Sequence, residues 1–209
     1  MRKSLSFALC AAALSACAGL PEAVNPLGPH DAPRLQRLAD PHTGIDQLLL
    51  VPLATAAVTG EGIPVGSHVE VGALFASYDR AQGDRVEGVA LIIKTVCPTA
   101  EPLFAWSRRL DLEVNGVVLE GNPSPDPRLY HIGRMATGVV ETLIVPVSPD
   151  LLRALAGAKE IHGEIGRRLR FEMGSEHRAG LAAFLDELPA SVRRGLRSKT
   201  DAIAAFIAL

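Results

Sequence analysis

The sequence predicts an α+β fold: mainly antiparallel β-strands in a sandwich-like arrangement, with short helices late in the chain. Between residues 45 and 147, apolar runs of strand length alternate with clusters of glycine, proline and aspartate. One such cluster, Asn115-Gly116, is typical of the tight turn of a β-hairpin. After Val147 the apolar residues recur at helical spacing. This order of strands followed by helices is the basis of the fold prediction.

Three apolar runs are predicted as the first strands: 48–58, 69–78 and 86–96. Within the third run, residues 89–93 have no polar face, which is typical of a central strand covered on both sides. A later strand is predicted at 139–147. Its Pro146 cannot donate a backbone hydrogen bond, which indicates a sheet edge or a bulge near the end of that strand.

The clearest hairpin has Asn115-Gly116 as its loop, because these residues accept the positive φ angles of a type I′ turn. A two-residue loop sets Val114 opposite Val117. The next pair on the same apolar face is Leu112 with Leu119. The acidic side chains point to the other face of the hairpin: Asp111, Glu113 and Glu120.

A second hairpin is predicted at 161–173, with the three-residue loop Gly166-Arg167-Arg168. Three loop residues are required because only that length places Ile165 and Leu169 on one apolar face. The same register sets two polar pairs opposite each other on the solvent side: Glu164 with Arg170 and His162 with Glu172. We expect these four side chains to form a solvated charge ladder.

Helices flank this second hairpin. The first begins at Ser148-Pro149-Asp150, which supplies an N-cap oxygen, a proline at the first helical position and an acidic residue in the first turn. Its apolar stripe consists of four residues: Leu151, Leu152, Leu155 and Ala158. Another amphipathic helix is predicted at 181–188, before Pro189. A last short helix is predicted from Thr200, with three large apolar residues on one side: Ile203, Phe206 and Ile207.

The first seventeen residues have the pattern of an export signal. A basic start precedes an apolar run at 5–14, which is too short to span a bilayer as a permanent helix. The run ends in Leu14-Ser15-Ala16-Cys17, which resembles the lipobox of bacterial lipoproteins. This resemblance implies that residues 1–16 are removed, that Cys17 is lipidated, and that the new amino terminus is acylated, for example with palmitate.

Lipidation at Cys17 implies a membrane anchor, because two or more acyl chains hold a protein stably on a bilayer. Residue 18 is Ala rather than the Asp that commonly retains such lipoproteins at the inner membrane. We therefore expect the periplasmic face of the bacterial outer membrane. The alternative is an ordinary secretory peptide cut at a nearby small residue, with Cys17 discarded or left as a free thiol.

The chain divides into four predicted parts: signal peptide 1–16, lipidated Cys and proline-rich tether 17–44, antiparallel β-rich domain with late helices 45–190, and C-terminal helical tail 191–209. A short helical turn at 34–39 is predicted to interrupt the tether. The full chain has 21 basic and 23 acidic residues and a formal net charge of −2. Nothing in this charge balance attracts nucleic acid, so no nucleic-acid partner is expected.

The remaining cysteine, Cys97, has no partner for an internal disulfide, because Cys10 lies in the signal and Cys17 carries lipid. We expect Cys97 to be a buried small apolar residue at the end of a strand, before Pro98. The alternatives are an intermolecular disulfide and a reactive thiol.

The six histidines follow no catalytic or metal-binding motif. His30 and His42 fall in the proline-rich segment, where no scaffold would hold a ligand rigidly. The others are candidates for an enzyme site only if the fold brings them together: His68, His131, His162 and His177. No catalytic, cofactor-binding or metal-binding residue and no cofactor is predicted.

The order of strand, short helix, hairpin and helix across residues 85–188 resembles that of bacterial envelope lipoproteins of unknown function. This resemblance implies no catalytic residues. We therefore expect a lipid-anchored, non-enzymatic periplasmic module that binds an envelope protein or supports envelope assembly. The alternative is an envelope hydrolase or a metal-dependent enzyme.

Overall fold

A computed structural model describes residues 34–40, 45–51, 55–79, 85–105, 107–119 and 130–193. The predicted export signal, the lipidation site Cys17 and the helix predicted from Thr200 lie outside the described residues. His30 and His42 also lie outside them.

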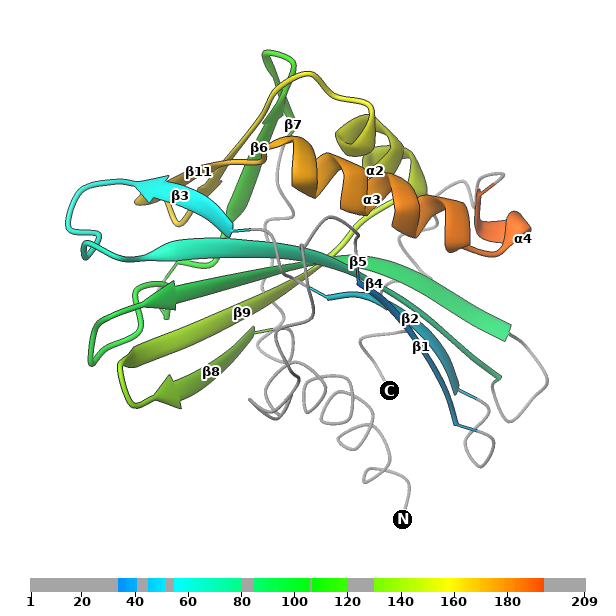
Figure 1. Ribbon diagram of the computed structural model, residues 1–209, viewed down its shortest axis with the longest axis horizontal. Helices are drawn as coiled ribbons and strands as arrows, with labels where there is room; N and C mark the ends of the chain where they lie inside the picture. The colour runs from blue at the N-terminus through cyan, green and yellow to red at the C-terminus, as the bar shows by residue number, and fades with distance from the viewer. Residues whose placement is uncertain are drawn as a thin grey trace.

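The described strands form one antiparallel sheet (Figure 1). The strands are β1 (Leu35–Asp40), β2 (Ile45–Leu50), β3 (Thr55–Thr59), β4 (His68–Asp79), β5 (Arg85–Cys97), β6 (Leu110–Val114), β7 (Val117–Leu119), β8 (Tyr130–Met135), β9 (Gly138–Pro146), β10 (Ile161–Ile165) and β11 (Leu169–Glu172). Their order is β7-β6-β10-β11-β3-β4-β5-β9-β8, and β2 joins β1 to β4. The helices are α2 (Pro149–Ala156), α3 (Ser175–Glu187) and α4 (Ala190–Arg193). The predicted α+β class, with mainly antiparallel strands and late helices, is confirmed.

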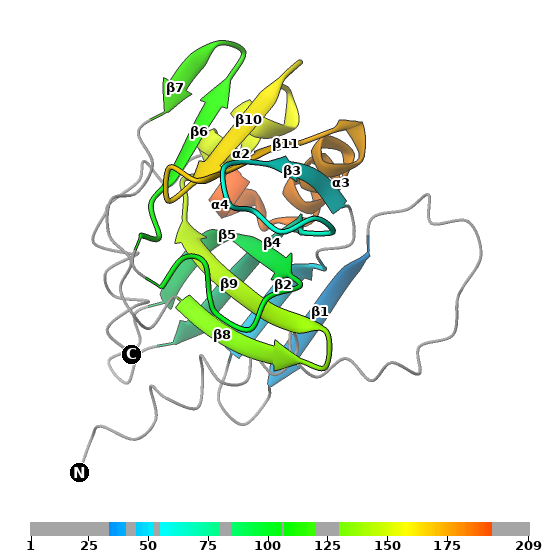
Figure 2. The ribbon, with the colours of Figure 1, turned by 90° about the vertical axis from the view of Figure 1, so that its left-hand side faces the viewer.

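The sheet curls at β4, because this strand has two different neighbours along the same edge. Residues 68–70 of β4 pair with β3, whereas residues 73–77 pair with β2. The sheet therefore bends into a half-barrel, and its two halves face each other across the helices (Figure 2). This single curled sheet produces the sandwich-like arrangement. The seam at β3 and β11 is short, with two register pairs: Arg170 with Thr59 and Phe171 with Val58.

The main core lies on the inner side of the curl. The inward residues of β4, β5, β6, β10 and β11 pack there against the apolar faces of α2 and α3. Four residues of α2 and α3 are completely buried in this core: Leu152, Leu155, Leu181 and Phe184. Burying an apolar side chain of this size contributes roughly 1.5–3 kcal/mol. The helices therefore bind the two halves of the sheet together.

The hairpin at Asn115-Gly116 has the predicted register, with Val114 opposite Val117 and Leu112 opposite Leu119. Asn115 has φ 51° and Gly116 has φ 80°, which confirms the two positive angles of a type I′ turn. Val114 is buried, but Val117 is 60% exposed. Because β7 lies at the end of the strand order, its side chains receive little cover.

The second hairpin also has the predicted register, from Ile165 with Leu169 to His162 with Glu172. Gly166 and Arg167 have φ 61° and 60°, and the Arg168 N–H donates to the Ile165 carbonyl at 3.1 Å. The loop is thus a turn with two left-handed residues followed by one extra residue. This geometry explains why glycine comes first in the loop rather than last.

Helix α2 begins as predicted, because the Ser148 Oγ accepts a hydrogen bond from the Leu151 N–H at 3.1 Å. Its buried stripe contains the predicted Leu152 and Leu155. Helix α3 contains the predicted apolar face of the 181–188 segment but begins earlier, at Ser175. Pro146 is the last residue of β9 and pairs with Ala90, beyond the last pair between β9 and β8 at Leu143.

Two sequence predictions are corrected by the strand assignments. The helical turn predicted at 34–39 is wrong, because residues 35–40 form β1 and pair with β2 over six positions. This pairing outweighs a weak local helical preference, and it extends the sheet into the segment predicted as tether. The run predicted as one strand at 48–58 forms parts of two strands, β2 and β3.

Candidate functional site

The outer face of β6, β10 and β11 is polar because residues alternate between the two sides of each strand. The inward residues of these strands are apolar or glycine, whereas the outward residues are charged. Strand pairing aligns the outward residues in two rows: Asp111-Glu164-Arg170 and Glu113-His162-Glu172. The predicted charge ladder is confirmed, and the pairing of β10 with β6 extends it by one strand.

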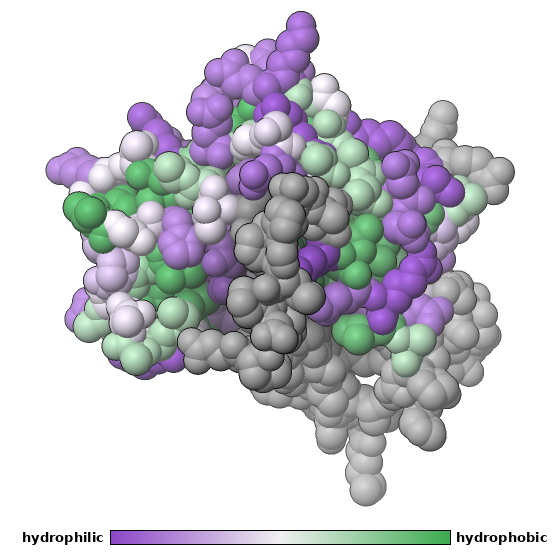
Figure 3. Space-filling view, in the orientation of Figure 1, coloured by the Kyte–Doolittle hydropathy of each residue, from purple (hydrophilic) through white to green (hydrophobic). Residues whose placement is uncertain are grey.

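This face contains a groove of about 1090 Å³ that runs from β6 across β10 and β11 to β3 and to the start of α3. Five carboxylates and two guanidinium groups line it: Asp111, Glu113, Glu164, Glu172, Glu176, Arg109 and Arg170. In the space-filling view, the region around β6 and β7 at the top is largely hydrophilic (Figure 3). We call this feature the carboxylate groove.

The first row of charges is largely neutralised by its own ion pairs. Arg170 Nε lies 2.8 Å from a carboxylate oxygen of Glu164. Arg109 Nε lies 2.8 Å from a carboxylate oxygen of Asp111. Both pairs are substantially exposed, so each contributes at most about 1 kcal/mol to stability. The first row therefore adds little net charge to the groove.

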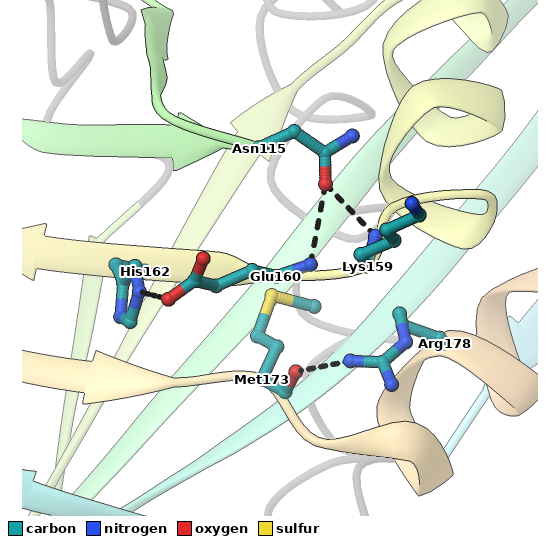
Figure 4. Close-up of polar contacts among 6 residues, drawn as sticks. All are labelled: Asn115, Lys159, Glu160, His162, Met173 and Arg178. Carbon is teal, nitrogen blue, oxygen red and sulfur yellow. Dashed lines mark hydrogen bonds and ion pairs between the residues drawn. The ribbon is translucent and has the colours of Figure 1, made fainter.

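The second row has an excess of negative charge. His162 is the only basic group between Glu113 and Glu172 in this row, and it lies 2.7 Å from Glu160 (Figure 4). The hydrogen bond with Glu160 is the main cause of a raised pKa of His162, and the charges of Glu172 and Glu113 also raise it. No ion pair joins Glu113 or Glu172 to another of the described residues. These two carboxylates are available to a cationic group.

Asn115 positions this second row from the neighbouring hairpin. Its Oδ1 accepts hydrogen bonds from the backbone N–H groups of Lys159 at 2.8 Å and Glu160 at 3.2 Å (Figure 4). The Asn115 N–H in turn donates to the Glu160 carbonyl at 3.0 Å. The turn residue therefore fixes the chain just before β10. The sequence predicted its turn conformation but not this second role.

We expect the Glu160→Gln substitution to lower the pKa of His162 toward its ordinary value of about 6.5. A raised pKa in the folded state means that the contact stabilises the fold fully below the unfolded pKa, and that this stabilisation is lost as pH rises through the folded pKa. NMR titration of the His162 ring measures the pKa directly. Glu164→Gln is the matched control, because Glu164 bonds to Arg170 instead. Equal His162 pKa values in both variants would contradict the conclusion that Glu160 is the main cause of the raised pKa.

His177 lines the same groove but has a structural contact. It lies in the first turn of α3 and is buried, and the Gly174 N–H donates to its Nδ1 at 3.1 Å. Nearby, the Met173 carbonyl accepts from Arg178 at 3.1 Å (Figure 4). Both contacts fasten the connection between β11 and α3. His177 therefore helps to shape the end of the groove.

The other two candidate histidines lie elsewhere. His68 begins β4 and its Nε2 lies 3.3 Å from Glu70, which also receives a hydrogen bond from Lys94 at 2.8 Å. His131 lies on β8 opposite Thr142. The fold thus brings His162 and His177 to one groove and leaves His68 and His131 outside its lining. Within the described residues, no group of three or more His, Cys, Asp or Glu side chains has a geometry that could hold a metal ion.

A second polar cluster lies inside the fold, around Glu141 of β9. Glu141 is 2% exposed and accepts hydrogen bonds from the backbone N–H groups of Leu103 and Phe104, both at 2.8 Å. The Tyr130 hydroxyl donates to the same carboxylate. Burial, followed by this hydrogen bond, raises the pKa of Tyr130 well above its usual range. The phenol therefore stays neutral and remains a donor.

Arg108 completes this cluster, with its guanidinium 4.1 Å from the centre of the Tyr130 ring. The adjacent cavity measures about 10 Å³, which is the space of a single water molecule. The buried Arg108 Nε has no hydrogen-bond partner among the described residues, and such a water would supply one. A cavity of this size holds no substrate. The role of the cluster is structural: it attaches the loop that follows β5 to strand β9.

Cys97 is the last residue of β5 and is 1% exposed, which confirms the predicted buried position at a strand end. Burial raises the pKa of its thiol. Because thiolate is the reactive form, this environment lowers the reactivity of Cys97.

In the part of the chain that the structure describes, no helix combines the length and apolar composition needed to cross a bilayer. Comparison of the chain with protein-family models, with curated proteins and with solved structures gives no match.

Proposed function

We propose that this protein is a lipid-anchored, non-enzymatic binding module at the periplasmic face of the bacterial outer membrane. In this proposal the acyl chains on Cys17 hold it at the membrane, and the carboxylate groove binds a positively charged segment of an envelope protein. The observation that carries the proposal is the second row of the groove. No ion pair joins Glu113 or Glu172 to another of the described residues there, and His162 is the only basic group between these two carboxylates.

The shape of the groove supports a polypeptide as the ligand. It is an open depression across four strands of a rigid sheet, and its floor is formed by paired backbone. Sites on strands hold side chains in fixed positions, so the spacing of the carboxylates is set before binding. Opposite charges at such a surface accelerate encounter and select partners more than they increase affinity. We therefore expect moderate affinity and a strong dependence on salt.

The predicted anchor supports the location in the proposal. Residues 18–34 connect Cys17 to β1 and would span about 50 Å if extended like polyproline, at roughly 3.1 Å per residue. This reach would hold the groove near the membrane while leaving it free to meet a partner in the periplasm.

Cys17→Ser is expected to move the protein from the membrane to the soluble periplasmic fraction, because thioether formation requires the sulfur. The measurement is fractionation of envelopes followed by immunodetection. Cys10→Ser is the matched control, because Cys10 lies within the predicted signal and should leave the fractionation unchanged. Membrane association of the Cys17→Ser protein at the wild-type level would exclude the anchor.

The double substitution Glu113→Gln and Glu172→Gln is expected to weaken binding of a fluorescent pentalysine peptide about three- to tenfold, because each exposed ion pair contributes up to about 1 kcal/mol. Fluorescence anisotropy of the peptide measures this affinity. The matched control replaces two exposed carboxylates outside the groove, Glu61 and Glu101, by glutamine. Binding to the wild type should also weaken as ionic strength rises. Equal losses in the two double variants would show that net charge, not the groove, attracts the peptide.

A further inference from the structure

We propose that the last ten residues of the chain, Thr200–Leu209, dock on the outer face of β2, β4 and β5 and cover an apolar patch there. The patch, which we call the outer apolar patch, consists of five residues: Leu49, Val51, Leu74, Ile92 and Ile144. It lies on the side of the sheet opposite to α2 and α3, and it is separate from the carboxylate groove.

Strand register places these residues together. Leu49 of β2 lies opposite Leu74 of β4, and Ile92 of β5 lies opposite Ile144 of β9. Their sequence neighbours Leu48, Ala73, Leu91 and Ile93 point to the other side and belong to the main core. Leu49, Val51, Leu74 and Ile92 instead form a separate cluster. The sheet therefore has apolar side chains on both of its faces at this point.

The outer apolar patch combines large and small side chains. Small residues lie between its large side chains, namely Gly72 and Ala76 on β4 and Ala90 on β5. A short amphipathic helix can pack an apolar edge against such a surface.

The patch is buried, although none of the described helices lies over it. Ile92 is 2% exposed, Leu49 is 3% exposed and Leu74 is 5% exposed. Helices α2, α3 and α4 all lie on the inner side of the curl, as both ribbon views show (Figures 1 and 2). Exposing side chains of this size to water would cost roughly 1.5–3 kcal/mol each. The cover that these side chains require must therefore be found outside the described elements.

The C-terminal segment has the sequence pattern of such a cover. Ile203, Phe206 and Ile207 recur at helical spacing and form one apolar edge. The segment between Cys17 and β1 is a poorer candidate, because it is rich in proline and has few large apolar residues. The apolar run at 5–14 is no candidate for the cover, because the proposed function has residues 1–16 removed with the signal.

The described part of the chain also ends near an edge of the sheet, from which the outer face can be reached. Helix α4 ends at Arg193, and its Val192 is buried in the main core. Just before it, Glu187 at the end of α3 forms an ion pair with Arg37 of β1. Among the described strands, β1 pairs with β2 alone, so this point is an edge of the sheet. The described part of the chain thus ends close to β1, the edge strand around which the outer face of the sheet can be reached.

The remaining linker is long enough to pass around this edge. Residues 194–199 span up to roughly 20 Å when extended. Packed layers are about 10 Å apart, so the path from the inner helix layer around β1 to a layer on the outer face is roughly 20 Å, which six extended residues can just span. The last ten residues then reach β2, β4 and β5.

Photocrosslinking in the full chain tests this docking. We replace Phe206 by the photoreactive residue p-benzoylphenylalanine, irradiate the purified protein and identify crosslinked peptides by mass spectrometry. The expected product joins residue 206 to a peptide from β2, β4 or β5. The control carries the same residue in place of Ala208, which lies on the opposite helical face, and it should give at least a fivefold lower yield.

Mixing isotopically light and heavy protein before irradiation distinguishes the possible occupants of the outer apolar patch. Crosslinks within one chain support the proposal. Crosslinks that join light to heavy chains would assign the patch to a second copy and overturn the proposal. Crosslinks that form only when phospholipid vesicles are present, or no crosslinks to these strands at all, would also overturn it.

A second measurement uses dye binding. The triple variant with Ile203, Phe206 and Ile207 changed to serine should increase the fluorescence of an apolar-surface dye at least twofold. The matched control changes Asp201, Ala205 and Ala208 to serine and should leave the fluorescence unchanged. Equal dye fluorescence in the two triple variants would contradict the docking. Far-UV circular dichroism confirms that both variants are folded, and the crosslinking result stands without either of them.

Discussion

Replacing Glu141 by alanine is expected to lower the free energy of unfolding by about 3–5 kcal/mol. The substitution leaves two backbone N–H groups, those of Leu103 and Phe104, without an acceptor in a buried site. It also leaves the Tyr130 hydroxyl without its partner. The loop between β5 and β6 would then lose its attachment to β9. Urea denaturation measures the change, since the midpoint shifts in proportion to the free energy of unfolding.

Two further variants separate the contributions to this effect. Tyr130→Phe removes one hydrogen bond and should cost about 1–3 kcal/mol. Glu101→Ala removes an exposed carboxylate from the same loop and should change stability by less than about 0.5 kcal/mol. A loss from Glu141→Ala no larger than the loss from Tyr130→Phe would show that the two backbone contacts contribute nothing.

Replacing Gly163 by valine is expected to cost about 3 kcal/mol or more, because the ring of Phe171 occupies the place of a side chain there. A Cβ atom at residue 163 would lie 2.2 Å from Phe171 Cζ and 2.4 Å from its Cε1. Phe171 is itself 3% exposed and belongs to the main core, so a shift of its ring would displace its core neighbours. Thermal unfolding monitored by circular dichroism measures the loss of stability.

Gly133→Val is the matched control, because Gly133 also lies within a strand. A Cβ atom at residue 133 would meet its nearest neighbour, Val140, at an ordinary 3.8 Å. A compensating change tests the cause: adding Phe171→Leu to Gly163→Val should recover part of the lost stability, since the smaller side chain makes room. Independent, additive losses from the two substitutions would refute the steric explanation.

Much of the fold could be predicted from the sequence because short-range signals agreed with the final packing. Asn115-Gly116 fixed the register of one hairpin, and the apolar pattern around Gly166 fixed that of the other. Ser148 marked the start of α2. The error at β1 has a physical cause: its residues become a strand because they pair with β2, and that partner is itself held by β4. Local propensity contains no information about such pairing.

Only part of the candidate site could be predicted from the sequence. The ladder from Glu164 to Arg170 follows from a hairpin loop, so its charges could be aligned residue by residue. The neighbouring contribution from Glu113 depends on the pairing of β6 with β10, which are separated by some fifty residues. Glu141 gave no signal at all, because its three donors come from two other segments of the chain. Long-range register decides these cases, and sequence periodicity does not report it.

The short seam between β3 and β11 has a consequence for how the half-barrel assembles. The β4–β5 hairpin has twelve register pairs and connects residues that are close in sequence, so it can form early. The seam joins residues about 110 positions apart through two pairs, so it forms at a high cost in chain entropy. We expect closure at Thr59 and Arg170 to be a late event in folding. Brief reopening at this seam would expose the edges of β3 and β11 first, before the rest of the sheet unfolds.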